Sequence, residues 1–144
     1  MPPVLKAIIG LLVALAAAWI WHGPLGNGGR LVDRLQGEAE AAVARSELPG
    51  IKVSLSRDPL ARTARLSGPA NDLQREGLGS QKGVSDYVRD VEGMAGVRWA
   101  DEPDAGRRIV PLLLETMALA ALAYLIGLGL GWLLWGRRRR EGFV

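Results

Sequence analysis

Hydrophobic positions along the 144-residue chain are gathered in two long apolar runs with a mixed polar and apolar segment between them. The first run, Val4–Trp21, carries one charged residue, and the second, Ile109–Trp135, carries only Glu115. At about 1.5 Å per residue, a helix formed by either run is long enough to cross the apolar core of a bilayer. We therefore predict an N-terminal transmembrane helix in residues 1–22 and a C-terminal one in residues 105–136.

The first apolar run also fits a cleaved signal peptide. Lys6 precedes a short apolar stretch that contains Ala16 and Ala18 at the spacing of a cleavage site. Trp19 and Trp21 stand at the far end of the run, where indole rings favour the headgroup layer at the end of a membrane span. We favour the uncleaved anchor and keep cleavage as the alternative.

The mixed segment begins with a glycine-rich stretch, residues 23–30, that predicts a flexible linker. Leu31–Glu47 then places apolar residues at helical spacing, and Pro49 with Gly50 ends that helix. Ile51–Leu55 and Thr63–Ser67 alternate apolar and polar residues as half-buried strands do. The short turn between these two strands predicts an antiparallel hairpin.

A second helical region is expected from Leu73 to near Gly93, with Asn71 or Asp72 available as the capping residue at its start. A glycine-rich run, residues 77–83, interrupts this region. Gly96–Trp99 follows as a third short strand. These elements predict an α+β domain of order α-β-β-α-β, with two helices on one face of a three-stranded sheet.

This order resembles the BON domain, a small module of bacterial envelope proteins. The matching features are the Val53/Leu55 strand, the strand end Leu66-Ser67-Gly68, the helix after it, and Gly96-Val97 before the last strand. The resemblance covers residues 31–102, and we assign the soluble domain to residues 31–104. It implies a module that attaches to phospholipid surfaces or to other proteins. No binding residue of the family is defined well enough to be carried over.

Charge sets the expected orientation of the chain in the membrane. Between His22 and Arg108, 13 basic residues balance 13 acidic ones, so the net charge of +3 comes from the chain ends. The basic tail, residues 137–144, follows the second apolar run directly and should stay in the cytoplasm, on the same side as Lys6. We predict a bacterial inner-membrane protein with both termini cytoplasmic and the central domain periplasmic. Because the basic charge sits beside a membrane helix, nucleic acid is not an expected partner.

Catalytic chemistry is not predicted for this chain. It has no cysteine and one histidine, and no pairing of nucleophile with base can be found in the sequence. We expect neither a metal site nor a cofactor, and we expect no enzymatic activity. The glycines Gly77, Gly79 and Gly83 miss the dinucleotide-binding spacing by one residue. A flexible break between two helices is favoured there, and a phosphate site beside Lys82 is the alternative.

Small residues in the apolar runs predict surfaces for helix packing. Every fourth residue is small at Gly10, Ala14 and Ala18, and Gly127 and Gly131 form a G-x-x-x-G pair. The partner of either surface is another helix of this chain, a second copy, or another protein. Glu115 is expected about 9 Å inside the second helix, where a shallow hydrogen bond is favoured over a contact with another subunit.

The leading functional hypothesis is a non-enzymatic scaffold or accessory subunit of a larger membrane complex. The alternative is a homo-oligomer that binds phospholipid surfaces or maintains the envelope. Expected partners are membrane lipids together with other membrane subunits or the chain itself. Trp99 is expected in the core, with exposure at the lipid interface as the alternative. The candidates for lipid or partner contact are Lys82, Trp99, Arg137, Arg138, Arg139 and Arg140.

Overall fold

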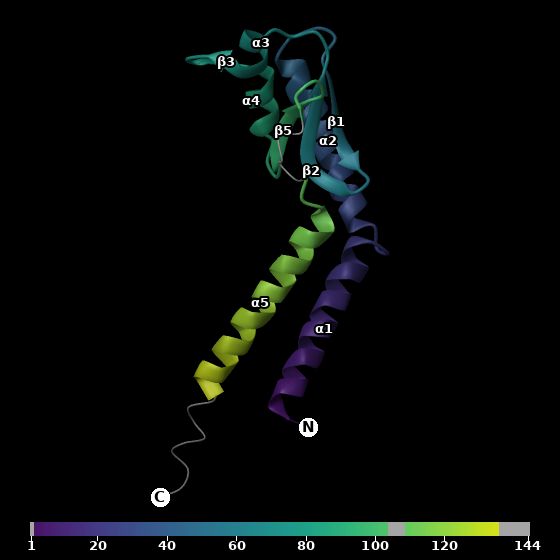
Figure 1. Ribbon diagram of the computed structural model, residues 1–144, viewed down its shortest axis with the longest axis vertical. Coiled ribbons are helices and arrows are strands. Elements are labelled where there is room, and N and C mark those ends of the chain that lie inside the picture. Colours follow the sequence, from purple (N-terminus) through teal and green to yellow (C-terminus); the bar gives the residue numbers. More distant parts are fainter. Residues whose placement is uncertain (1, 104–108, 136–144) are drawn as a thin grey trace, which may run out of the picture. The chain divides into compact units, whose positions relative to one another are not determined.

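The computed structural model describes residues 2–103 and 109–135 of the chain (Figure 1). These residues divide into two compact units. One unit joins the two chain ends, up to Leu25 and from Leu113 onward, and the other comprises Gly26–Leu112. Each unit is described by itself below.

The unit made from the chain ends contains α1 (Pro3–His22) and α5 (Leu112–Trp135). Both helices are long and apolar enough to cross a membrane. Most of their large apolar side chains are exposed, among them Leu12, Leu119 and Leu125. The helix α5 begins three residues later than the apolar run suggested, and Glu115 therefore lies in its first turn. Glu115 is about 4.5 Å from the start of α5 along the helix axis, where the sequence suggested 9 Å.

The central unit is an α+β fold, as the sequence predicted. Its elements, in chain order, are α2 (Asn27–Arg45), β1 (Lys52–Arg57), β2 (Leu60–Ser67), α3 (Asp72–Glu76), β3 (Gly77–Leu78), β4 (Gln81–Lys82), α4 (Val84–Arg89) and β5 (Gly96–Trp99).

In the described part of the chain, β1, β2 and β5 form a three-stranded mixed sheet with β2 in the centre (Figure 1). β1 pairs antiparallel with β2, so that Val53 lies opposite Leu66, which confirms the predicted hairpin. β5 runs parallel to β2, with Trp99 opposite Leu66. The segment from α3 to α4 provides the crossover connection that two parallel neighbouring strands need.

The core lies between one face of this sheet and two helices, α2 and α4. Leu35 of α2 and Leu66 of β2 are fully buried and are the largest such side chains. Burying a leucine contributes about 1.5–3 kcal/mol, so these residues are central to the stability of the unit. The rest of the core cluster is apolar and comprises Val32, Ala39, Ala42, Val43, Val53, Leu55, Ala64, Val84, Val88, Val91, Trp99 and Leu112.

The predicted linker, residues 23–30, is shorter in the structure. α2 begins at Asn27, and Gly28 is buried inside its first turn. Gly26 precedes the helix with φ at 70°, a left-handed conformation that glycine adopts without a steric penalty. Four residues, 23–26, therefore separate α1 from α2.

The glycine-rich run of residues 77–83 is a tight hairpin of β3 and β4, where the sequence analysis favoured a flexible break. The chain crosses itself closely at the base of the hairpin. A Cβ atom on Gly77 would collide with the carbonyl oxygen of Gln81, and one on Gly83 would collide with backbone atoms of Arg75 and Gly77. Gly79, at the turn, has φ at 60°. Backbone geometry therefore accounts for these three glycines. α4 is correspondingly short and ends at Arg89, before the expected end near Gly93.

Candidate interaction sites

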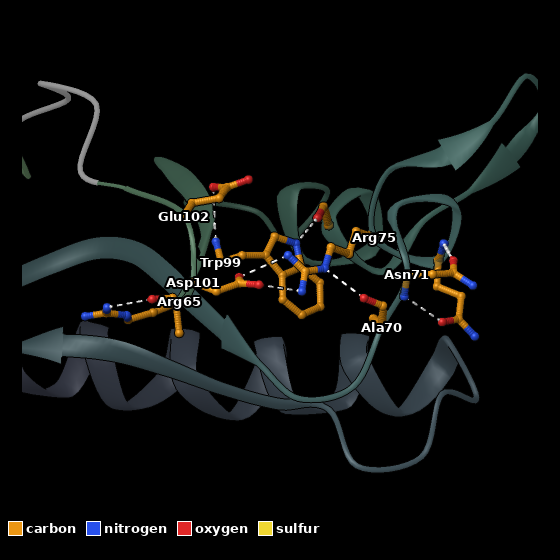
Figure 2. A network of polar contacts seen from close by, with 10 residues as sticks. Arg65, Ala70, Asn71, Arg75, Trp99, Asp101 and Glu102 are labelled. Atoms are coloured by element: carbon orange, nitrogen blue, oxygen red, sulfur yellow. Dashed lines mark hydrogen bonds and ion pairs between the residues drawn. The ribbon is translucent and has the colours of Figure 1, made fainter.

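Trp99 lies in the core with 3% of its surface exposed, so the core interpretation of this residue is confirmed. Its indole Nε1 donates a hydrogen bond to Ser85 Oγ at 3.0 Å (Figure 2). The Ser85 hydroxyl in turn donates to Glu76 Oε1 at 3.3 Å. The indole group thereby connects β5 to α4 and, through Ser85, to α3. With its ring buried, Trp99 is not available to insert into a lipid surface, and the alternative role as an interfacial anchor is wrong.

Arg75 lies over the ring face of Trp99. Its guanidinium carbon lies 4.2 Å from the centre of the Trp99 ring, a cation–π contact. The guanidinium also makes a two-pronged ion pair with Asp101, at 3.0 and 2.7 Å, and its Nε donates to the carbonyl oxygen of Ala70 (Figure 2). This hydrogen bonding raises the pKa of Arg75 and lowers the pKa of Asp101. These contacts hold α3 against Trp99 of β5 and against Asp101, which follows that strand.

Lys82, the candidate for a phosphate or lipid contact, is paired within the chain. Its Nζ lies 2.6 Å from Asp90 Oδ2, and this pair raises the pKa of Lys82 and lowers that of Asp90. The backbone N–H of Gly83, at the start of α4, donates to the carboxylate of Asp86 at 3.2 Å. A negative side chain thus already occupies the helix start where a phosphate was considered, and α4 spans only six residues. The geometry does not support an anion site there.

In the helical unit, Gly10 allows α5 to approach α1 closely. The Tyr124 hydroxyl donates a hydrogen bond to the Ala7 carbonyl oxygen at 2.7 Å, and a Cβ atom on Gly10 would collide with the same phenol. Ala14 and Ala18, on the same face of α1, are half-buried in a helix that is otherwise mostly exposed. Tyr124 was not singled out from the sequence. The signal was present, because it is the one phenol within a long apolar run.

Gly127 and Gly131 are not used in this helix pair. A Cβ atom on either residue would meet nothing within 4 Å among the described atoms. Their role as a packing surface therefore stays a prediction about a partner outside the chain. Glu115 is half-buried in the first turn of α5, where its negative charge is favourable to the helix dipole. Arg137, Arg138, Arg139 and Arg140 lie outside the described residues.

A surface that the sequence did not reveal lies along the outer edge of β1. Gln36 of α2 reaches this edge and forms hydrogen bonds with the backbone of Val53 and Leu55. Next to it is a groove of about 580 Å³ between the end of α2 and the beginning of β1. Its lining residues are Glu40, Val43, Ala44, Glu47, Leu48, Pro49, Ile51, Lys52 and Val53. A glutamine in a helix has no sequence pattern that would predict such a contact.

Comparison of the chain with protein-family models, with curated proteins and with solved structures gives no match.

Proposed function

We infer that this protein is a non-enzymatic, two-span protein of the bacterial inner membrane that presents a BON-like interaction module in the periplasm. The observation that carries this proposal is the placement of α1 and α5, which are long and apolar enough to cross a membrane and which flank the central unit in the chain. If both helices span the bilayer, the chain enters and leaves the central unit on the same side of the membrane. The basic tail then assigns the other side to the cytoplasm.

The order of elements in the central unit supports the BON-like assignment. A helix, a two-stranded hairpin, a helical crossover and a last strand follow one another, as expected from the resemblance. The unit is small, and the polar groups around Trp99 form hydrogen bonds and a cation–π contact with one another. These features favour a role in interaction, as a scaffold or an accessory subunit of a larger membrane complex.

The helical unit supports an assembly role in the membrane. Gly10 and Tyr124 account for packing within the chain, while a Cβ atom on Gly127 or Gly131 would meet nothing within 4 Å among the described residues. Small residues in a membrane helix let a second helix approach closely, which is how helices associate in lipid. The G-x-x-x-G surface is therefore the membrane surface that we assign to a partner subunit.

The test is extraction of the full-length chain in mild detergent by a tag at its C-terminus, followed by a native gel and mass spectrometry of what migrates with it. Stoichiometric membrane subunits in the same band are expected. Replacing Gly127 by isoleucine should weaken that association, and replacing Leu125, which lies on the same helix but outside the glycine pair, by isoleucine should not. A chain that migrates alone as a monomer would contradict the assembly role.

A further inference from the structure

We draw no further inference here: the strongest candidate, the cavity of about 190 Å³ lined by residues of β1, β2 and β5 with Arg65 and Arg98 side by side in its wall, carries nothing because Glu102 also lines it and Arg65 already donates a hydrogen bond to the Ala100 carbonyl oxygen, so nothing in the structure shows what would fill it.

Discussion

At the scale of single residues, Trp99 connects three short elements because its ring edge and its ring face bind different groups. The edge donates to Ser85 on α4, and the face receives the guanidinium of Arg75 on α3. The helix α3 has no buried side chain of its own, whereas α4 contributes Val84 and Val88 to the core. The polar contacts around the indole group are therefore most important for the position of α3.

Substitution of Trp99 separates the contributions of its edge and its face. Trp99→Ala removes both and leaves a cavity, and we expect it to lower the free energy of unfolding of the central unit by about 3–5 kcal/mol. Trp99→Phe keeps an aromatic face for Arg75 but loses the bond to Ser85, and its cost should be about 1–3 kcal/mol. Urea unfolding of the full chain in detergent, followed by far-UV circular dichroism, measures both. Equal losses in the two variants would contradict the separation of roles.

The Arg75–Asp101 pair predicts how stability depends on pH. Hydrogen bonding to Arg75 lowers the pKa of Asp101 in the folded state, so the pair stabilises the fold above the unfolded pKa, which is about 3.9. That stabilisation is lost as the pH falls through the lowered pKa. Asp101→Asn should therefore be less stable than the natural chain at pH 7, and the two should converge in strong acid. Urea midpoints across this range give the comparison, and a constant difference at all pH values would contradict it.

At the scale of elements, two glycines differ in whether the fold leaves room for a side chain. Gly68 ends β2 with φ at 133°, and a Cβ atom there would collide with the carbonyl oxygen of Gly50. Gly37 lies inside α2, and a Cβ atom there would meet nothing within 4 Å. The first glycine is required by the fold, and the second only weakens its helix.

Alanine at these two positions should therefore change stability in opposite directions. Gly68→Ala is expected to lower the free energy of unfolding by about 1–3 kcal/mol, because it forces a strained backbone against another chain segment. Gly37→Ala should raise it by about 0.5–1 kcal/mol, because alanine loses less conformational freedom in a helix. The same urea experiment measures both, and a stabilising Gly68→Ala would contradict the described turn.

The pair of membrane-length helices gives a third test at this scale. Tyr124→Phe loses the bond to the Ala7 carbonyl oxygen, at a cost of about 0.6 kcal/mol, typical of such bonds in membranes. Gly10→Val should cost more, because the valine side chain collides with the phenol. Combining Gly10→Val with Tyr124→Ala should recover part of this loss, and Gly127→Val, with open space around it, should have little effect. Thermal unfolding in detergent measures the series, and no recovery in the double variant would contradict the contact.

What the sequence predicted at this scale followed from periodic side chains. The strands of the hairpin, the helix face with Leu35 and the cap at Asn71 each depend on local patterns, and the structure has all three. The glycine run of residues 77–83 was misinterpreted because its tight hairpin depends on where two backbone segments cross, which leaves no pattern in side chains. Gln36 was missed for the same reason. Its function comes from the strand edge that α2 packs beside, and that edge exists only in the folded unit.

At the scale of the whole molecule, the two units differ in the surface that they expose. The helices α1 and α5 expose apolar side chains, and either lipid or a protein partner is needed to cover them. In the proposed function the central unit supplies the interaction, and the groove beside β1 is one feature of its surface. If the membrane helices and the soluble unit both contact the same partner, the two weak contacts reinforce each other.

The orientation of the whole chain is the last prediction. Ser80, at the exposed tip of the β3–β4 hairpin, and Val4, near the start of α1, should lie on opposite sides of the membrane. Single cysteines at these positions can be labelled selectively because the natural chain has none. In bacterial cells with a permeabilised outer membrane, a membrane-impermeant maleimide should label Ser80→Cys at once and Val4→Cys only after lysis. Labelling of Val4→Cys before lysis would place the N-terminus outside and would require a different arrangement of the two helices, since the positive charge of Lys6 would then face the periplasm.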